Sequence, residues 1–149
     1  MDLGLDGHIA VVTGASKGIG LAVVHALVGE GALVVAGARS TEALDGLYGV
    51  TPVAVDLATP EGPATLVRRA LDDHGRVDVL VNNVGAVRLR LDGFLAVSDD
   101  EFQWAMELNV FSALRATRAA VTAMVEQGSG TVVVTGANFV IDGGLIKTT

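Results

Sequence analysis

Eight residues near the amino end, Thr-Gly-Ala-Ser-Lys-Gly-Ile-Gly at positions 13–20, have the composition of a phosphate-binding turn. The glycines stand at Gly14, Gly18 and Gly20, between the apolar run His8–Val12 and a helical pattern of apolar residues. Glycine lets the backbone approach a pyrophosphate closely, and the amino end of a helix supplies free N–H groups and a positive dipole end. In this strand–turn–helix context the spacing predicts a dinucleotide-binding turn, and the alternative is a tight turn without a ligand.

Short strands and helices alternate along the chain, as a fold that positions such a turn requires. Apolar runs predict strands at 8–12, 33–36, 53–55, 77–81 and 131–134, and helical spacing predicts helices at 19–29, 41–47, 60–74 and 98–127. Ser98 and Glu101 form a capping box that marks the start of the last helix. Because strands made of apolar runs are covered on both faces, the alternation predicts an α/β fold with a doubly wound parallel sheet of five main strands.

The last stretch of the chain departs from this alternation. An apolar run at 138–141 follows the strand at 131–134 after only a few residues, whereas a parallel neighbour needs a crossover of about a dozen residues. The run therefore pairs as an antiparallel hairpin, pairs with another chain, or stays unpaired. We interpret the chain as one dinucleotide-binding domain, residues 1–149, with a cofactor-binding portion at 1–134 and a C-terminal strand segment at 135–149.

Composition narrows the class of protein. With 149 residues, 50% of them hydrophobic and 18% charged, the chain can bury a core. Its net charge of -7 argues against nucleic-acid binding. No apolar run approaches the roughly 18 residues of a membrane span, and the start lacks the features of a secretory signal, so we expect a cytoplasmic protein that does not bind a membrane. The absence of cysteine excludes cysteine zinc sites, and His8, His25 and His74 lack the spacing of metal ligands.

Several motifs, in order and at matching distances, resemble those of the short-chain dehydrogenase/reductase family. The turn at 13–20 is similar to the family's glycine motif. Asp56 and Leu57 follow the third predicted strand, where the family contacts adenine, and Asn-Asn-Val-Gly at 82–85 resembles the family's Asn-Asn-Ala-Gly. Asn109 lies in the long helix where the family keeps an asparagine. The resemblance runs from the first residues to about position 134 and implies a Rossmann-like fold.

The end of the second predicted strand bears on the choice of dinucleotide. NAD-preferring relatives place an acidic residue there for the ribose 2′-OH, but this chain has Ala38 followed by Arg39. An arginine can pair with a 2′-phosphate, and Lys17 adds a second cation, so we expect NADP rather than NAD; the alternative is that both are ordinary surface charges. The residues that the resemblance implies for cofactor contact are Gly14, Ala15, Ser16, Lys17, Gly18, Ile19, Gly20, Arg39, Ser40, Asp56, Leu57, Asn83 and Gly85.

The family's machinery for moving a proton is missing from this chain. Family members transfer a hydride between nicotinamide and a carbonyl or alcohol carbon, with a Tyr, a Lys four residues later and a Ser. Tyr48 is the single tyrosine and has no such lysine, and no serine follows Ser129. Asn109 alone remains of the family's four catalytic residues.

The stretch Thr-Gly-Ala-Asn-Phe-Val-Ile-Asp-Gly-Gly at 135–144 resembles the family's final strand, here joined directly to the fifth. The chain thus looks like a truncated family member from which an internal block is absent. We expect an NADP-binding, oxidoreductase-like protein that is impaired or inactive alone; the alternative is a non-catalytic dinucleotide-binding or oligomer-forming module. Because the missing block would uncover apolar surface, we also expect a homo-oligomer. The sequence does not identify a substrate.

A few other side chains could have a functional role, but a structural or surface role is the simpler interpretation for each. Asp78 is expected to fix the backbone near the fourth strand, and Trp104 and Phe102 are expected to pack in the helical stretch. Arg88 and Arg90 follow the Asn-Asn-Val-Gly turn and could face a ligand, although a surface position is the simpler interpretation.

Overall fold

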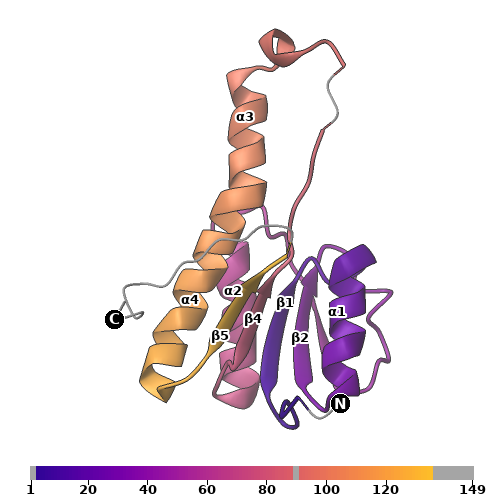
Figure 1. The fold of residues 1–149 in the computed structure, drawn as a ribbon, viewed down its shortest axis with the longest axis vertical. Coiled ribbons are helices and arrows are strands. Elements are labelled where there is room, and N and C mark those ends of the chain that lie inside the picture. Colours follow the sequence, from indigo (N-terminus) through magenta and orange to yellow (C-terminus); the bar gives the residue numbers. More distant parts are fainter. Residues whose placement is uncertain (1–2, 89–90, 136–149) are drawn as a thin grey trace.

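The computed structural model describes residues 3–88 and 91–135, which form a five-stranded parallel sheet in the order β3-β2-β1-β4-β5 (Figure 1). The strands are β1 (Ile9–Thr13), β2 (Leu33–Ala38), β3 (Val50–Ala54), β4 (Val79–Asn82) and β5 (Thr131–Val134). The predicted α/β fold with five parallel strands is therefore confirmed. The strand predicted at 138–141 lies outside the described residues.

Helices cover the sheet unequally. They are α1 (Gly18–Gly29), α2 (Gly62–His74), α3 (Asp99–Met106) and α4 (Ser112–Gln127), with a 3-10 turn η1 (Phe94–Ala96) and a π-helical turn η2 (Glu107–Phe111). Helix α1 lies on one face of the sheet, and α2 and α4 lie on the other (Figure 1). The predicted capping box is present, because the Ser98 hydroxyl accepts from the Glu101 N–H and the Glu101 carboxylate accepts from the Ser98 N–H.

The predicted helix at 41–47 and the bounds of some other elements were wrong. The fourth strand begins at Val79 rather than at position 77, and the single helix predicted at 98–127 is divided into α3, η2 and α4. The helix expected at 41–47 is a series of turns, and Gly46 within it has a φ of +77°, which ends any helical path. The third strand runs from Val50 to Ala54 rather than over 53–55, and so contains Pro52. Because β3 is the edge strand of the sheet, a residue without an N–H donor is tolerated there.

The core consists of two apolar layers, one on each side of the sheet. Alternate residues of β1 serve the two layers: Ile9 and Val11 pack with α2 and α4, while Ala10 and Val12 pack with α1. Every residue of β1 is buried, as expected of a central strand covered on both faces. Together these contacts fix β1, and with it the turn at 13–20, in the middle of the sheet.

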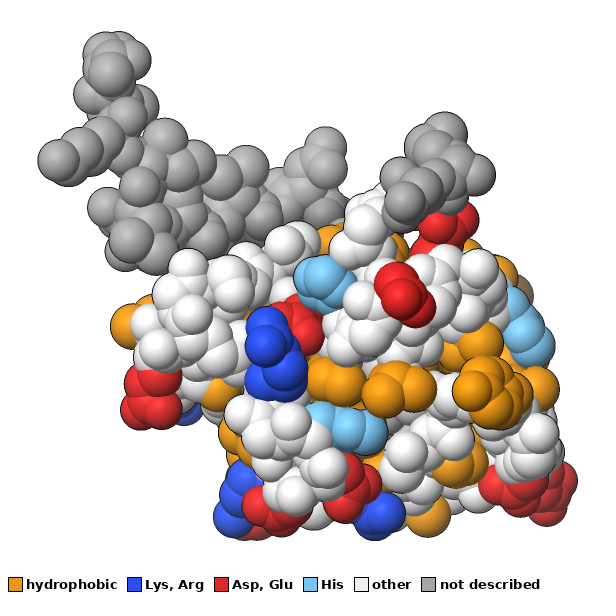
Figure 2. Space-filling model, turned by 90° about the horizontal axis from the view of Figure 1, so that it is seen from below, with side chains coloured by type: hydrophobic (Ala, Val, Ile, Leu, Met, Phe, Trp, Pro, Cys, Tyr) orange, Lys and Arg blue, Asp and Glu red, His pale blue; other side chains and the backbone are white. Residues whose placement is uncertain are grey.

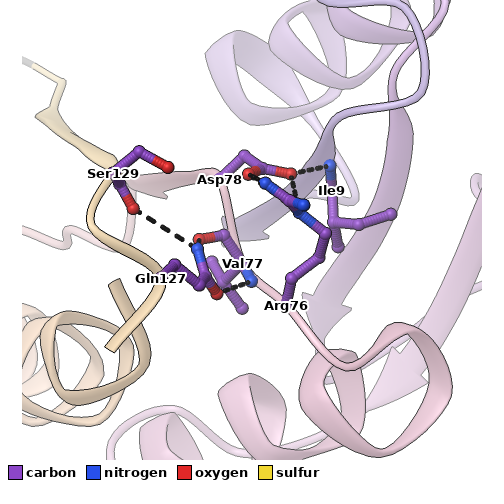
Figure 3. Close-up of polar contacts among 6 residues, drawn as sticks. All are labelled: Ile9, Arg76, Val77, Asp78, Gln127 and Ser129. Carbon is purple, nitrogen blue, oxygen red and sulfur yellow. Dashed lines mark hydrogen bonds and ion pairs between the residues drawn. The ribbon is translucent and has the colours of Figure 1, made fainter. Parts of the chain in front are cut away.

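Polar groups clamp the amino ends of β1 and β4 together (Figure 3). The carboxylate of Asp78 accepts from the Ile9 N–H at 2.9 Å and from Nε of Arg76 at 3.0 Å, and the Asp78 N–H donates to the Ile9 carbonyl. The Gln127 side chain bonds both the N–H and the carbonyl of Val77 at 2.9 Å, which ties the end of α4 to the same place. The predicted role of Asp78 in fixing the backbone is confirmed.

The charge of Asp78 is stabilised at this clamp. Burial by itself would raise the pKa of the Asp78 carboxyl, but hydrogen bonds from Arg76 and Ile9 and the positive charge of Arg76 lower that pKa below its usual value.

On the face that the amino ends of the strands form, acidic and basic side chains are interspersed with separate apolar patches (Figure 2).

Helix α3 and the segment before it project beyond the carboxyl ends of the strands (Figure 1). We call residues 86–111 the arm. Its described part exposes seven large apolar side chains, namely Val87, Leu91, Phe94, Leu95, Phe102, Met106 and Phe111.

Among the helices of residues 3–88 and 91–135, none combines the length and the apolar character needed to cross a membrane.

Replacing Asp78 with alanine should destabilise the fold at neutral pH by about 2–4 kcal/mol, because a buried charged acceptor is lost and the Ile9 N–H is left unpaired. A carboxyl with a lowered pKa in the folded state stabilises the fold above its unfolded pKa, and this contribution disappears as the pH falls through its folded pKa. Urea unfolding should therefore show a difference between wild type and Asp78→Ala that is large at neutral pH and shrinks below the usual carboxyl range.

The matched control is Asp73→Ala, which removes only the partly exposed i,i+4 pair with Arg69. It should cost no more than about 0.5 kcal/mol at any pH. Equal effects of the two substitutions at neutral pH would contradict the clamp.

Candidate dinucleotide-binding site

The glycine turn joins β1 to α1 through a very close approach of backbone to backbone. Gly14 and Gly18 have φ values of +65° and +54°, a region that favours glycine. A Cβ atom placed on Gly20 would lie 2.2 Å from the Gly14 carbonyl oxygen and 2.5 Å from Nδ2 of Asn83. No side chain fits at Gly20, so the first turn of α1 is drawn against the end of β1, as the sequence predicted for residues 13–20.

Side chains from β1 and from the end of β4 lock this turn in place. The Thr13 hydroxyl accepts from the N–H groups of Asn83 and Val84, at 2.9 and 3.2 Å. Nδ2 of Asn83 donates to the Gly14 carbonyl at 3.0 Å, and its Oδ1 accepts from the Thr135 hydroxyl at 2.9 Å. The amide of Asn83 thus holds the glycine turn, a role that sequence reasoning, which expected a cofactor contact, did not foresee.

A cleft of about 720 Å³ crosses the carboxyl end of the sheet over this turn. Ten residues predicted for cofactor contact line it, namely Gly14, Ser16, Lys17, Gly18, Ile19, Arg39, Asp56, Leu57, Asn83 and Gly85. Three others do not: Ala15 is buried and donates its N–H to the Gly37 carbonyl, Gly20 lies beneath the turn, and Ser40 is exposed beyond the lining.

Eight further residues line the cleft, namely Ala38, Val55, Ala58, Val84, Ala86, Arg88, Trp104 and Leu108. Of these, Arg88 was named as a side chain that could face a ligand, and its place in the lining agrees with that alternative, whereas Arg90 lies outside the described residues. Six of the eight lie at the end of a strand or within six residues after one, and that position is a usable signal, because the carboxyl ends of parallel strands form the ligand crevice of such sheets. Trp104 and Leu108 come from α3 and η2 and carry no such signal. Trp104 was expected to serve packing alone, and its place in the cleft wall corrects that interpretation.

The chemistry of the cleft suits an anionic, two-part ligand. Lys17 stands at the N-cap of α1 without a side-chain capping bond, and a Cβ on Gly18 would meet nothing within 4 Å. The amino end of the helix is therefore open to the cleft, where a phosphate is favoured. Within the described residues neither Lys17 nor Arg39 forms an ion pair, so two cations remain for the ligand.

Asn109 connects the segment after β4 to the long helical stretch. Its Nδ2 donates to the carbonyls of Ala86 and Ala105, both at 2.9 Å, and its Oδ1 accepts from the Ala86 N–H at 3.0 Å. It lies in the π-helical turn η2, where the widened backbone frees the Ala105 carbonyl from its usual helical partner. Asn109, which the resemblance gave as the remnant of the catalytic set, thus bonds the backbone of Ala86 and Ala105 in this structure.

A second cleft of about 540 Å³ adjoins the first. Its lining consists of Ala86, Val87, Arg88, Val97, Glu101, Phe102, Trp104, Ala105 and Asn109. The two clefts share Ala86, Arg88 and Trp104. Together they form a long cleft and a smaller chamber beside it. In the described part of the chain, no three His, Asp or Glu side chains gather as metal ligands would.

Comparison with known proteins agrees with this geometry. The family described as short chain dehydrogenase matches residues 8–143. L-xylulose reductase of Mus musculus is 42% identical over 132 residues, which cover 86% of this chain and 52% of that protein. The 7alpha-hydroxysteroid dehydrogenase of Clostridium sardiniense is 36% identical over 138 residues, which cover 87% of this chain and 53% of that protein.

Solved structures give the same result. L-sorbose reductase from Gluconobacter frateurii, crystallised with NADPH and L-sorbose, superposes with a TM-score of 0.82 at 36% identity, over 90% of this chain and 54% of that one. A short-chain dehydrogenase from Streptomyces avermitilis gives a TM-score of 0.79 at 38% identity, over 87% of this chain and 49% of that one. The chain spans about half the length of the curated relatives that it matches. With its glycine turn, parallel sheet and matched motifs, this chain belongs to the short-chain dehydrogenase/reductase family.

Proposed function

We propose that this chain binds NADP(H) in the 720 Å³ cleft, with the pyrophosphate over the glycine turn. The observation that carries the proposal is the approach of Gly20 to the Gly14 carbonyl, which leaves the amino end of α1 open where a phosphate would lie. In this arrangement Gly14 and residues 16–19 hold the pyrophosphate, Asp56 and Leu57 flank the adenine, and Asn83 and Gly85 border the other nucleoside.

The end of β2 favours the phosphorylated dinucleotide. Ala38 carries no acid to bind a ribose 2′-OH, and Arg39 follows it on the margin of the cleft without an ion-pair partner among the described residues. Arg39, with Ser40 beside it, is placed to receive a 2′-phosphate through charge-assisted hydrogen bonds. NAD lacks that phosphate and gains nothing from Arg39.

When bound, the dinucleotide supplies hydride transfer between nicotinamide and a carbonyl or alcohol carbon. The residues of this chain bind and orient it, but they offer no phenol to handle the accompanying proton. Tyr48 is 93% exposed and lies two residues before β3, at the amino ends of the strands and so opposite the cleft. We propose that the chain alone holds the cofactor without turning it over as a reductase does, and that a non-catalytic binding module is the second candidate function.

The exposed apolar side chains support a proposal that the chain associates with a second copy. The seven on the arm together expose roughly 700–900 Å², close to the about 800 Å² that each partner contributes to a standard interface. In β5, Val132 and Val133 are 37% and 42% exposed. Association would remove this surface from water.

Gly20→Ala should abolish NADPH binding, because its Cβ would force α1 away from the Gly14 carbonyl. We expect at least a 50-fold loss of affinity in a titration of NADPH fluorescence, consistent with about 2 kcal/mol or more of lost interaction. Gly29→Ala is the matched control, since it lies in the same helix and its Cβ would meet nothing within 4 Å. A Gly20→Ala variant that binds NADPH like Gly29→Ala would refute the site.

Arg39→Gln should weaken NADPH binding about 10- to 100-fold and leave NADH binding within a factor of about two, as expected for one charged contact to a 2′-phosphate. Both titrations are made on the same protein, with Arg68→Gln as control because Arg68 is exposed on α2 outside the cleft. Equal losses for the two dinucleotides would show that Arg39 does not select the phosphate.

Gel filtration with light scattering should find the wild-type chain as a dimer or larger at micromolar concentration.

The same fractions, mixed with NADPH and a simple aldehyde, should oxidise NADPH no faster than buffer, because no tyrosine of this chain reaches the cleft. A stable monomer would contradict the association, and turnover at the rate of an ordinary reductase would contradict the proposed loss of catalysis.

A further inference from the structure

Arg88 and Trp104 stand where the two clefts meet, since both residues line the 720 Å³ cleft and the 540 Å³ cleft. The guanidinium carbon of Arg88 lies 3.9 Å from the centroid of the Trp104 ring. Such stacking holds the guanidinium plane against the indole face while its N–H groups stay available at the edge. The two side chains come from different segments, one after β4 and the other in α3.

The guanidinium of Arg88 has no other partner in residues 3–88 and 91–135. No hydrogen bond or ion pair to it occurs there. The other polar side chains that line the smaller cleft are engaged, because Glu101 accepts from Ser98 in the capping box and the Asn109 amide bonds Ala86 and Ala105. Arg88 is thus a positioned cation whose donors face a largely apolar chamber.

The order of the strands shows which half of the bound dinucleotide lies near Arg88. Strands β2 and β4 flank β1 on opposite sides. If Arg39, at the end of β2, holds the 2′-phosphate of the adenosine half, the nicotinamide half extends past the glycine turn toward the end of β4. Arg88 follows β4, so the smaller cleft opens beside the nicotinamide half. This step rests on the proposed function.

We propose that Arg88, held on Trp104, determines specificity for a carbonyl compound that carries an anionic group. The chamber has the size of a small-molecule site, its walls are mostly apolar, and the guanidinium of Arg88 is the cation among its described lining residues. A carboxylate pairs with two N–H groups of a guanidinium at once, which fixes its position as well as its charge. A carboxylate on the substrate would dock on Arg88 and direct the carbonyl toward the nicotinamide half of the cleft.

The same guanidinium could instead contact the pyrophosphate of the dinucleotide, and the experiment separates these two sources of negative charge. Protein saturated with NADP⁺ is titrated by calorimetry with 4-carboxybenzaldehyde and, separately, with its neutral methyl ester. Wild type should bind the charged aldehyde at least tenfold more tightly than the ester. Because Trp104 is the single tryptophan, a change in tryptophan fluorescence during the titration would place the probe beside Arg88.

Arg88→Gln should bring the affinity for the charged aldehyde down to that for the ester, a loss of at least tenfold, and leave the affinity for the ester unchanged. Arg118→Gln is the control, since Arg118 is exposed on α4 and lines neither cleft. Equal binding of the two aldehydes by wild type would overturn the proposal. So would a loss of NADPH affinity in Arg88→Gln, which would assign Arg88 to the pyrophosphate. Absence of NADPH binding by wild type would be a different result, since it would refute the proposed function itself.

Discussion

The close approach of α1 to the end of β1 is the constraint on which the site depends. Gly20 lies against the Gly14 carbonyl, and the same carbonyl accepts a hydrogen bond from Asn83 at the end of β4. The helix amino end is therefore fixed relative to two strands at once. Since β1 is central, β2 on one side and β4 on the other supply the walls of the cleft, and a ligand that spans both sides must cross the positive end of α1.

The side chains at the amino ends of the strands stabilise the fold, whereas those at the carboxyl ends form the cleft. At the amino ends, Asp78 and Gln127 satisfy backbone groups of β1 and of the segment just before β4, and Arg76 pairs with Asp78 (Figure 3). At the carboxyl ends, the hydrogen bonds of Thr13 and Asn83 hold the backbone, but cations on the rim of the cleft keep their donors for a ligand. A substitution at the first end acts through folding, whereas one at the second can change binding while the fold remains intact.

The sequence predicted correctly those structural features that depend on residues close together in the chain. The apolar runs and the glycine turn needed no long-range information, and the capping box of Ser98 and Glu101 marked the start of α3 correctly. The short helix at 41–47 failed because Gly46 adopts a left-handed conformation there. The contact between Arg88 and Trp104 could not be predicted, because it depends on how far the arm carries α3 past the sheet. The use of the Asn83 amide within the turn likewise appears only when β4 and β1 are placed side by side.

The proposed cofactor cradle and the groups that would move a proton depend on different parts of the chain. Within the described residues, the hydrogen bonds that shape the glycine turn are made by Thr13, Gly14, Asn83, Val84 and Thr135. A proton relay instead requires a phenol and an ammonium group brought to the nicotinamide end, whereas Tyr48 lies at the opposite end of the sheet. The arm exposes apolar surface beside that same end. The proposed association surface and the proposed cofactor site therefore adjoin each other at the carboxyl end of the sheet.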